Sequence, residues 1–571
     1  MKKIIPMIIA LLLIVVVGAV AFGGRILDKY SYSKELADLD EYYGVINAAV
    51  GTEDGNLAII LQDELIAEQA VVTNGTIYFD LDTVKKYFNE IFYADINEQK
   101  LLFTSADDTF TALFGDNGYS DSKGVHQTEY EICYLSGEKL YIAAEYVKQF
   151  ANFSYEKFDR HLQIYTEWGV KQTYDVAKAT QLRVKGGIKS PILRELEKGE
   201  TVELLEQMET WSKVKTSDSV IGYVENKRLT NMSTEVETPV TSYVPAEYTS
   251  VGLEGKVSLG WHAIYGEKGN GTLDDMVAEG KGMNVIAPTW FSLTDNEGTF
   301  RSFATQQYVD KAHGYGLQVW GVWDDFNAGV EIDSNQLFSF TTRRQTLVQN
   351  MIATALQYNL DGINIDFEKM SGESRPHFSQ FLRELSVQCR QNGLTLSIDN
   401  YVPLNSANYS RLDIQGQVAD YVIIMGYDEH WGGCGEAGSV ASIDYVSGGI
   451  DRTLEHVPAE KVINALPFYT RVWKTEGTQV TDEAIPLCNM GDYLKRIGKE
   501  DAAVWDELTC QNYLEWQSGD AVYQIWLEDE ESLGVKLNVM NARGIGGVAV
   551  WRLGYGTTGA WNLVATYAAS E

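Results

Sequence analysis

The sequence contains few cysteines, histidines and basic residues for its length. Its 571 residues include 5 cysteines and 7 histidines, with no Cys-x-x-Cys pair and no histidine cluster, so we expect neither a disulfide framework nor a metal site. Cys488 and Cys510 could pair, but their spacing does not decide this. The 46 basic residues are outnumbered by 80 acidic ones, which gives a net charge of −34. Such a chain lacks the positive surface that binds phosphates, so we expect no nucleic-acid partner.

Long uncharged runs made almost entirely of apolar residues are absent except near the N-terminus. After Lys2 and Lys3, residues 4–24 carry no charge, and roughly 20 such residues can cross a bilayer as a helix. The two lysines favour the cytoplasmic side, which would place the rest of the chain outside. We therefore expect residues 1–24 to anchor the protein in the membrane at the cell surface. Ala19-Val20-Ala21 could instead be a signal-peptide cleavage site, which would make the protein secreted.

The chain is too long for a single core, so we expect three or more domains. Residues 45–170 appear duplicated, because Ile77-Tyr78-Phe79 and the residues after it have counterparts from Leu140-Tyr141-Ile142 onward. Each copy indicates a strand followed by a short helix. The pattern resembles the copper-amine-oxidase N-terminal-like stalk modules of secreted bacterial proteins, although no cluster of copper-ligating histidines is present. We expect an α+β spacer here, without a cofactor.

Residues 177–232 change to short β-type runs separated by Gly and Ser turns, such as Trp211-Ser212-Lys213-Val214-Lys215. Strands of this length predict a small all-β barrel. The segment resembles bacterial SH3-like domains, which often hold an enzyme to the cell wall, so either wall binding or a spacer role is open. Residues 233–250 are rich in Thr, Ser, Glu and Pro and are typical of a linker.

Residues 251–571 contain eight β-type runs that alternate with helical patterns, which predicts a (β/α)8 barrel. The gap between the seventh and eighth runs is the longest and should hold an insertion. The runs are 256–261, 283–288, 317–323, 361–367, 394–398, 420–425, 461–466 and 547–551.

The fourth run has a period of two between apolar and polar residues. Ile363, Ile365 and Phe367 alternate with Asn364, Asp366 and Glu368. Such alternation indicates a strand, on which residues two apart lie roughly 6.5 Å apart along the backbone. Asp366 and Glu368 can therefore converge on one substrate bond. Because unpaired carboxylates are costly to bury, they should line a cleft.

The segment Asp361-Gly362-Ile363-Asn364-Ile365-Asp366-Phe367-Glu368 is similar to the fourth-strand signature of family-18 glycoside hydrolases, Asp-Gly-x-Asp-x-Asp-x-Glu. It departs from that signature at Asn364. Met425-Gly426-Tyr427-Asp428 resembles the sixth-strand Met-x-Tyr-Asp, and Trp551 resembles the eighth-strand tryptophan. The resemblance covers residues 251–571. Asn364 and residues 288–291, 425–431 and 467–469 are most similar to the branch with spore-cortex-lytic and cell-wall N-acetylglucosaminidases of Gram-positive bacteria.

This resemblance implies a role for each motif residue in a reaction where the acetamide of the substrate attacks the sugar. Glu368 would act as the general acid and then the base. Asp366 would hold the acetamide N–H, and its charge would raise the pKa of Glu368. Tyr427 would donate its hydroxyl to the acetamide oxygen. Asp428 would bind sugar hydroxyls or position Asp366, and Trp551 would form the floor under the reacting ring.

Other residues are expected at the rim of this site. Asn364 is expected to bind the substrate, and Met425 could contact the substrate or fill the core. Because the amide of Asn364 cannot share a proton, we expect Asp366 to be charged over a wider pH range than beside an aspartate. Aromatic side chains suit sugar faces, although each could equally be a core residue. Those that could widen the groove are Trp290, Trp323, Trp431, Tyr469 and Trp473.

The sequence therefore predicts a monomeric enzyme without cofactor or metal. The resemblance implies that it cleaves β-1,4 bonds after N-acetylglucosamine in peptidoglycan or another polysaccharide containing that sugar. A chitinase is the alternative enzyme. A carbohydrate-binding protein without catalysis is a further alternative, which the presence of Glu368 disfavours.

Overall fold

The computed structural model describes residues 4–239, 241, 243–327, 329–405 and 410–570. The chain divides into two compact units. The first contains residues 1–92, 112–119 and 125–245, and the second contains residues 93–111, 120–124 and 246–571. All five cysteines are free, including Cys488 and Cys510.

The N-terminal run lies in helix α1 (Ile4–Tyr30), which is followed by the short helix α2 (Leu39–Tyr43). Lys2 and Lys3 lie outside the described residues, as do the side chains of residues 19–27. Within the described part of the chain, no helix combines the length and the apolar character needed to cross a membrane. The expected transmembrane segment is therefore not supported by the structure.

The stalk region folds into a seven-stranded sheet in the order β11-β12-β1-β2-β3-β10-β9. Its two apparent repeats meet directly, because β3 and β10 pair antiparallel with Phe79 opposite Ile142, its counterpart in the other copy. A short helix follows each of these strands, as the duplicated pattern predicts. The elements are β1 (Gly55–Leu61), β2 (Glu64–Thr73), β3 (Thr76–Asp80), α3 (Leu81–Tyr87), β9 (Cys133–Ser136), β10 (Lys139–Ala143), α4 (Ala144–Val147), β11 (Ser154–Lys157) and β12 (His161–Tyr165).

A second seven-stranded sheet follows, in the order β15-β14-β18-β17-β16-β13-β19. Its short strands enclose a small core that includes Leu182, Val202, Val214 and Val224. The strands are β13 (Val170–Val176), β14 (Thr180–Arg183), β15 (Ile192–Leu196), β16 (Thr201–Gln207), β17 (Trp211–Thr216), β18 (Ile221–Glu225) and β19 (Leu229–Val236).

The predicted (β/α)8 barrel is confirmed in the second unit. Eight parallel strands follow one another around the barrel, and the pairing of β21 with β24 closes it. The strands are β20 (Val257–His262), β21 (Val285–Pro288), β24 (Gln318–Asp324), β25 (Gly362–Asp366), β26 (Thr395–Tyr401), β27 (Tyr421–Met425), β28 (Val462–Pro467) and β34 (Gly547–Trp551). The hairpin β22 (Phe291–Leu293) and β23 (Phe300–Ser302) extends the sheet beside β24.

Helices surround the barrel, and the main core lies between helices and strands. A smaller core inside the barrel includes Trp320, Val322, Ile423 and Ile463. The helices are α5 (Leu273–Glu279), α6 (Gln306–Gly314), α7 (Ser334–Phe338), α8 (Thr341–Tyr358), α9 (Arg375–Asn392), α10 (Leu412–Val418), α11 (Ile443–Leu454), α13 (Glu530–Ala542) and α14 (Thr558–Ala568).

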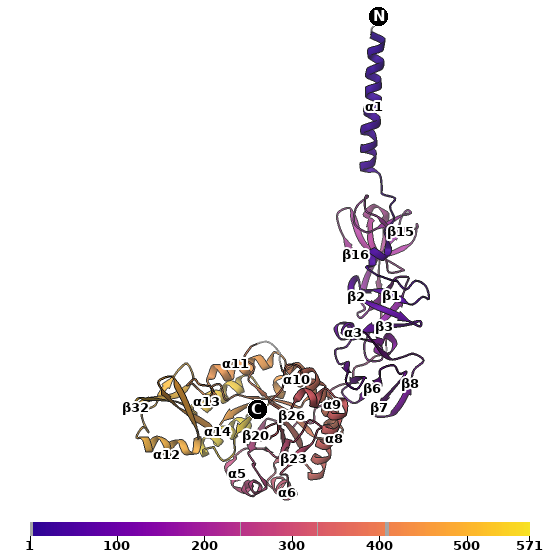
Figure 1. Cartoon of the computed structure of the whole chain (residues 1–571). Coiled ribbons are helices and arrows are strands. Elements are labelled where there is room, and N and C mark those ends of the chain that lie inside the picture. The colour runs from indigo at the N-terminus through magenta and orange to yellow at the C-terminus, as the bar shows by residue number, and fades with distance from the viewer. Residues whose placement is uncertain (1–3, 240, 242, 328, 406–409, 571) are drawn as a thin grey trace. The chain divides into compact units, whose positions relative to one another are not determined.

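Helix α8 precedes strand β25 in the chain and helix α9 follows it. The two helices pack against each other (Figure 1). Helix α8 ends at Asn359 and α9 at Gly393, both of which have left-handed backbone conformations, with φ of 55° and 66°. Asn and Gly are the residues that adopt this conformation most readily. At these two residues the chain reverses direction and enters β25 and β26, the strands that carry Asp366 and Asp399.

The long gap between the seventh and eighth strands holds an insertion, as the spacing predicts. It forms an antiparallel sheet in the order β30-β29-β33-β32-β31, covered by one helix. The elements are β29 (Tyr469–Glu476), β30 (Gln479–Pro486), α12 (Leu487–Ile497), β31 (Val504–Asp506), β32 (Gln511–Ser518) and β33 (Ala521–Leu527).

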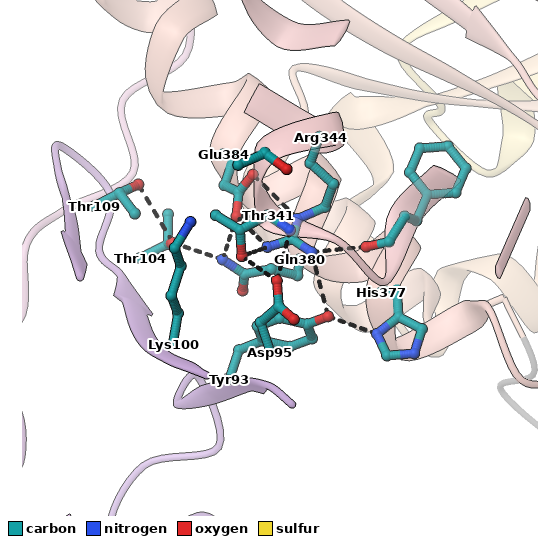
Figure 2. Close-up of polar contacts among 12 residues, drawn as sticks. Tyr93, Asp95, Lys100, Thr104, Thr109, Thr341, Arg344, His377, Gln380 and Glu384 are labelled. Atoms are coloured by element: carbon teal, nitrogen blue, oxygen red, sulfur yellow. Dashed lines mark hydrogen bonds and ion pairs between the residues drawn. The ribbon is translucent and has the colours of Figure 1, made fainter. Parts of the chain in front are cut away.

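Residues 93–111 lie in the predicted stalk segment but pack with the barrel as part of the second unit. They include β4 (Tyr93–Asp95), β5 (Lys100–Thr104) and the start of β6 (Thr109–Leu113), in a sheet completed by β7 (Gly118–Asp121) and β8 (Gly124–Gln127). We call residues 93–111 the docking segment. Figure 2 shows its contacts with α8 and α9.

The docking segment caps helix α8. Asp95 Oδ2 accepts hydrogen bonds from the backbone N–H and the hydroxyl of Thr341, both 2.6 Å long, although 246 residues separate the two. The residue at the N-cap position, Phe340, has no side chain that can cap the helix. A carboxylate at this end satisfies free N–H groups and faces the positive end of the helix dipole. The helix therefore depends on a distant segment for its first turn.

A buried ion pair lies beneath this cap (Figure 2). Arg344 and Glu384 connect α8 to α9 at 3.1 Å, with side chains 0% and 7% exposed. The hydroxyl of Tyr93 accepts a hydrogen bond from Arg344 Nη1 at 3.3 Å, and Gln380 Nε2 donates to Thr104 Oγ1 at 2.9 Å. The ion pair is thus part of a network that includes the docking segment.

Replacing Glu384 with leucine should destabilise the barrel by about 3–5 kcal/mol, because the buried Arg344 would lose its counter-ion. The measurement is the guanidinium dependence of the barrel's unfolding transition. The matched control is Glu297→Gln. This variant breaks the ion pair between Glu297 and Arg343, the residue next to Arg344 in the chain, and the side chain of Glu297 is 63% exposed. That exposed pair should contribute only about 0–1 kcal/mol. Equal effects of the two variants would contradict the structural role of the buried pair.

Candidate active site

The site is a cavity of about 590 Å³ at the carboxyl ends of the barrel strands, the end at which active sites of such barrels lie. Six of the residues predicted from the sequence line it together: Met425, Tyr427, Asp428, Trp551, Asp366 and Glu368. They come from β25, β27 and β34 and from the residues that follow those strands. The structure therefore brings together the acids and aromatics that the motifs predict.

Asn364 lies below the cavity and does not line it. It is fully buried, and its Oδ1 accepts a hydrogen bond from Trp261 Nε1 at 3.0 Å. Its Nδ2 donates to Ser397 Oγ and to Asp399 Oδ1, each at 2.9 Å. Asn364 was predicted to bind substrate, but its contacts show a supporting role, because every polar atom of its side chain is engaged within the protein.

Three aspartates lie in one row across neighbouring strands. Asp324 on β24 is the direct partner of Asp366 on β25. The register that places Ile365 opposite Ile398 brings Asp366 alongside Asp399 on β26. Neighbouring strands are about 4.8 Å apart, and laterally adjacent residues of parallel strands point to the same face. All three carboxyl groups therefore face the cavity, which they line.

Glu368 follows β25, and neighbouring side chains hold it in place. The hydroxyl of Tyr401 donates a short hydrogen bond to Glu368 Oε2. The buried Asp325 accepts the backbone N–H groups of Glu368 and Lys369 at 3.2 and 2.9 Å. Burial raises the pKa of Glu368, the Tyr401 hydrogen bond lowers it, and the charge of Asp325 raises it. The net effect is upward, so this carboxyl keeps its proton to higher pH than an exposed glutamate.

The direction of this shift was predicted, but its cause was not. Burial, rather than the charge of Asp366, is its main source, and the hydrogen bond with Asp366 lowers the pKa of Glu368. The pKa of Asp366 itself lies well above its usual range because of burial, followed by the charges of Asp399 and Glu368. The expectation that Asp366 is charged over a wider pH range was therefore wrong. Asp399 supplies the neighbouring acid that Asn364 does not.

Tyr427 and Asp428 continue from β27 into the cavity. Burial raises the pKa of Tyr427 far above its usual range, so its hydroxyl stays a hydrogen-bond donor at any working pH. Asp428 has a left-handed backbone with φ of 57°, a conformation that non-glycine residues adopt mainly at special sites. Its Oδ1 accepts a hydrogen bond from the hydroxyl of Tyr469 at 2.6 Å. Tyr469 therefore acts by positioning Asp428 and does not line the cavity.

Among the tryptophans predicted at the site, Trp551 lines the cavity, and most of the others lie in the core. Trp551 is partly exposed in the cavity and meets Trp261 edge to face, with ring centres 6.0 Å apart. Trp290 was predicted to bind substrate, but it is fully buried and donates to Asn270 Oδ1 at 2.8 Å. Trp323 and Trp473 are also buried, whereas Trp431 is 55% exposed. An aromatic side chain after the end of a strand can point into the core or into the groove. Trp290 points into the core, so it does not line the groove.

Four functional residues were missed in the sequence. Asp324, Asp325, Asp399 and Tyr401 belong to β24, β26 or the turn after β24. The alternation of Ser397, Asp399 and Tyr401 is the same signal that identified β25. A search for the same alternation at the carboxyl ends of the neighbouring strands would have identified Asp399 and Tyr401.

Comparison with protein families gives two matches. Residues 292–556 match the model of glycosyl hydrolases family 18, and residues 178–230 match the bacterial SH3 domain. The first match includes Asp366, Glu368, Tyr427 and Trp551, and the second lies within the sheet β13–β19.

Two relatives among curated proteins illustrate the similarity. The uncharacterized glycosylase YvbX of Bacillus subtilis is 26% identical over 301 residues, which cover 49% of this chain and 84% of the relative. The cortical fragment-lytic enzyme of Bacillus anthracis is 26% identical over 234 residues, which cover 39% of this chain and 53% of that enzyme. The chain therefore spans about half the length of the cortical fragment-lytic enzyme.

Solved structures support the fold. The chitinase of Chromobacterium violaceum aligns with a TM-score of 0.50 and 22% identity, covering 55% of this chain and all of that one. The spore cortex-lytic enzyme SleL of Bacillus cereus aligns with a TM-score of 0.50 and 20% identity, covering 59% and 78%.

Proposed function

We propose, from the family-18 glycosyl hydrolase domain that this chain contains, that it cleaves β-1,4 bonds after N-acetylglucosamine in peptidoglycan. The observation that carries the proposal is that Glu368, an acid whose pKa is raised mainly by burial, shares one cavity with Asp366, Tyr427 and Trp551. In this scheme Trp551 holds the apolar face of the sugar that precedes the scissile bond.

The reaction begins with proton transfer from Glu368 to the oxygen of the scissile bond. The acetamide oxygen of the same sugar attacks the anomeric carbon and displaces the rest of the glycan, so no protein carboxylate becomes bonded to the sugar. The hydroxyl of Tyr427 orients the acetamide. Asp366 accepts its N–H and stabilises the positive charge that develops on the ring formed with it.

Glu368 is now a carboxylate and takes a proton from a water molecule that attacks the anomeric carbon. The acetamide is released as the new C–O bond forms. Two inversions restore the β configuration, so the reaction proceeds with retention.

Three observations favour peptidoglycan over chitin. The chain carries a bacterial SH3 domain, and a relative is named for lysis of cortical fragments. Asn364 and residues 288–291, 425–431 and 467–469 together resemble the cell-wall branch of the family. The proposal also places the enzyme outside the cytoplasm at the cell surface, which the uncharged run 4–24 supports.

The test is digestion of purified peptidoglycan, reduction of the new ends and mass spectrometry of the released fragments. We expect reduced N-acetylglucosamine at the new ends and none with the Glu368→Gln variant. Chitin is digested in parallel with the same protein. New ends of N-acetylmuramic acid would contradict the proposed bond, and hydrolysis of chitin alone would contradict the proposed substrate.

A further inference from the structure

Three acids of the site have no cation beside them. Among the described residues, Asp366 Oδ1 is buried and has no hydrogen-bond partner. Within the same residues, Asp399 accepts from the neutral amide of Asn364. Glu368 accepts from the neutral hydroxyl of Tyr401 and is also hydrogen-bonded to Asp366. The side chain of Asp399 is 7% exposed. These groups lie in a low-dielectric environment in which like charges repel strongly.

The nearby cations act on other acids. Arg301 lowers the pKa of Asp324, although burial keeps that pKa raised. Lys369 lowers the pKa of Asp325, which burial again raises, and Arg471 pairs with Asp482 and, more weakly, with Asp428. Several titratable groups therefore surround Asp366 and Asp399. They are Glu368 just after β25, Asp324 at the end of β24, Asp325 in the turn after β24, Tyr401 from β26, and Tyr427 and Asp428 after β27.

Adjacent buried carboxyl groups cannot all lose their protons, and such a pair titrates as one unit. Asp366 and Asp399 are adjacent by strand register, and the charge of Asp399 is the strongest of those acting on Asp366. Asp399 lines the main cavity together with Asp366, and it also lines a second, smaller cavity together with Glu368.

We propose that Asp399 is a positioning residue that shares one proton with Asp366 and takes it over when Asp366 binds the substrate. The inference rests on the proposed function, because it concerns the acid that holds the acetamide. Asn364 fixes the orientation of Asp399 through its Nδ2 hydrogen bond.

The proton balance is simple. In the free enzyme one proton bridges the Asp366 and Asp399 carboxyl groups. When the acetamide N–H reaches Asp366, the proton stays on Asp399, and Asp366 becomes a carboxylate that accepts the N–H. When the product leaves, the proton bridges the two groups again. No proton enters or leaves the pair during the cycle. Glu368, although hydrogen-bonded to Asp366, gives its own proton to the leaving group.

The experiment compares the pH profiles of wild type, Asp399→Asn and Asn364→Asp/Asp399→Asn on soluble glycan fragments of peptidoglycan. Asp399→Asn should lower kcat about 100-fold, the effect of a misplaced reacting group. It should also move both limbs of the profile to lower pH by about one unit or more, because the remaining acids lose a negative neighbour. The double variant places a carboxyl group at position 364, two residues before Asp366 on the same strand. It should recover at least tenfold of kcat and move the profile back towards the wild type.

The matched control is Asp451→Asn, which removes a carboxylate on α11 that pairs with Arg543 on the outer surface. It should leave both kcat and the pH profile unchanged. Melting temperatures of all variants show whether each is folded.

Two outcomes would overturn the inference. A folded Asp399→Asn variant with the wild-type pH profile would mean that Asp399 carries no shared proton. A double variant no better than Asp399→Asn would mean that Asp399 only accepts the Asn364 hydrogen bond. A wild-type enzyme that releases no glycan ends would instead refute the proposed function, so the two failures can be distinguished.

Discussion

Replacing Glu368 with glutamine is expected to reduce hydrolysis by at least roughly 100-fold to 10,000-fold, which is the range that general acid catalysis contributes. The amide keeps the shape of the side chain and can still accept the hydrogen bond from Tyr401, but it has no proton to give to the leaving oxygen. The loss should appear in kcat and in kcat/KM alike, since the proton is transferred only in the transition state.

The measurement is the initial rate of release of reducing ends from purified peptidoglycan. Glu297→Gln, the same substitution at an exposed position on the barrel, is the control and should keep the wild-type rate. The melting temperature of Glu368→Gln should not fall, because a buried acid without a cation does little for stability. A folded Glu368→Gln enzyme with near-normal turnover would exclude Glu368 as the acid.

Removal of the acetyl group from the substrate is expected to abolish cleavage almost completely. The attacking atom in the proposed reaction belongs to the acetamide, and positioning such a group contributes about 7–11 kcal/mol to lowering the barrier. A free amine offers neither the attacking oxygen nor the N–H geometry that Asp366 and Tyr427 receive. Glycan strands whose glucosamine residues are chemically N-deacetylated should therefore resist this enzyme.

The measurement compares acetylated and deacetylated strands of equal length, again by release of reducing ends. A muramidase that works through its own carboxylate is the control, and it should be less affected. Proton NMR of the first product should show the β anomer. Comparable turnover of both strands, or an initial α product, would require a different mechanism even if Glu368 proved essential.

The sequence predicted the barrel and most of the site because these depend on patterns within single strands. The alternation between residues 361 and 368 identifies one strand and the face that carries its acids. Each β-type run can be recognised from its own composition. The alternation of eight such runs with helical patterns then predicts the barrel. Asp366 and Glu368 lie in the cavity as the alternation between residues 361 and 368 predicts, and Tyr427 and Trp551 lie there as the family resemblance implies.

The remaining features depend on neighbours that the sequence does not reveal. The importance of Asp399 follows from the register of β25 and β26, which brings it beside Asp366. Trp290 lies in the core because of contacts with Asn270 and Tyr308, whereas its position after a strand equally favours the groove. The docking segment has no periodic signal linking it to α8, so its place with the barrel was not predictable.

The docking segment also determines which pieces of this protein can be made separately. A gene fragment that begins at the linker would encode every barrel strand but omit Asp95, whose carboxylate caps α8. It would also omit Tyr93 and leave one side of the Arg344 network open to water. Because the catalytic unit is not contiguous in the chain, a single protease cut between residues 233 and 250 would not release it in complete form. Its shortest expressible version must carry residues 93–111 along with the barrel.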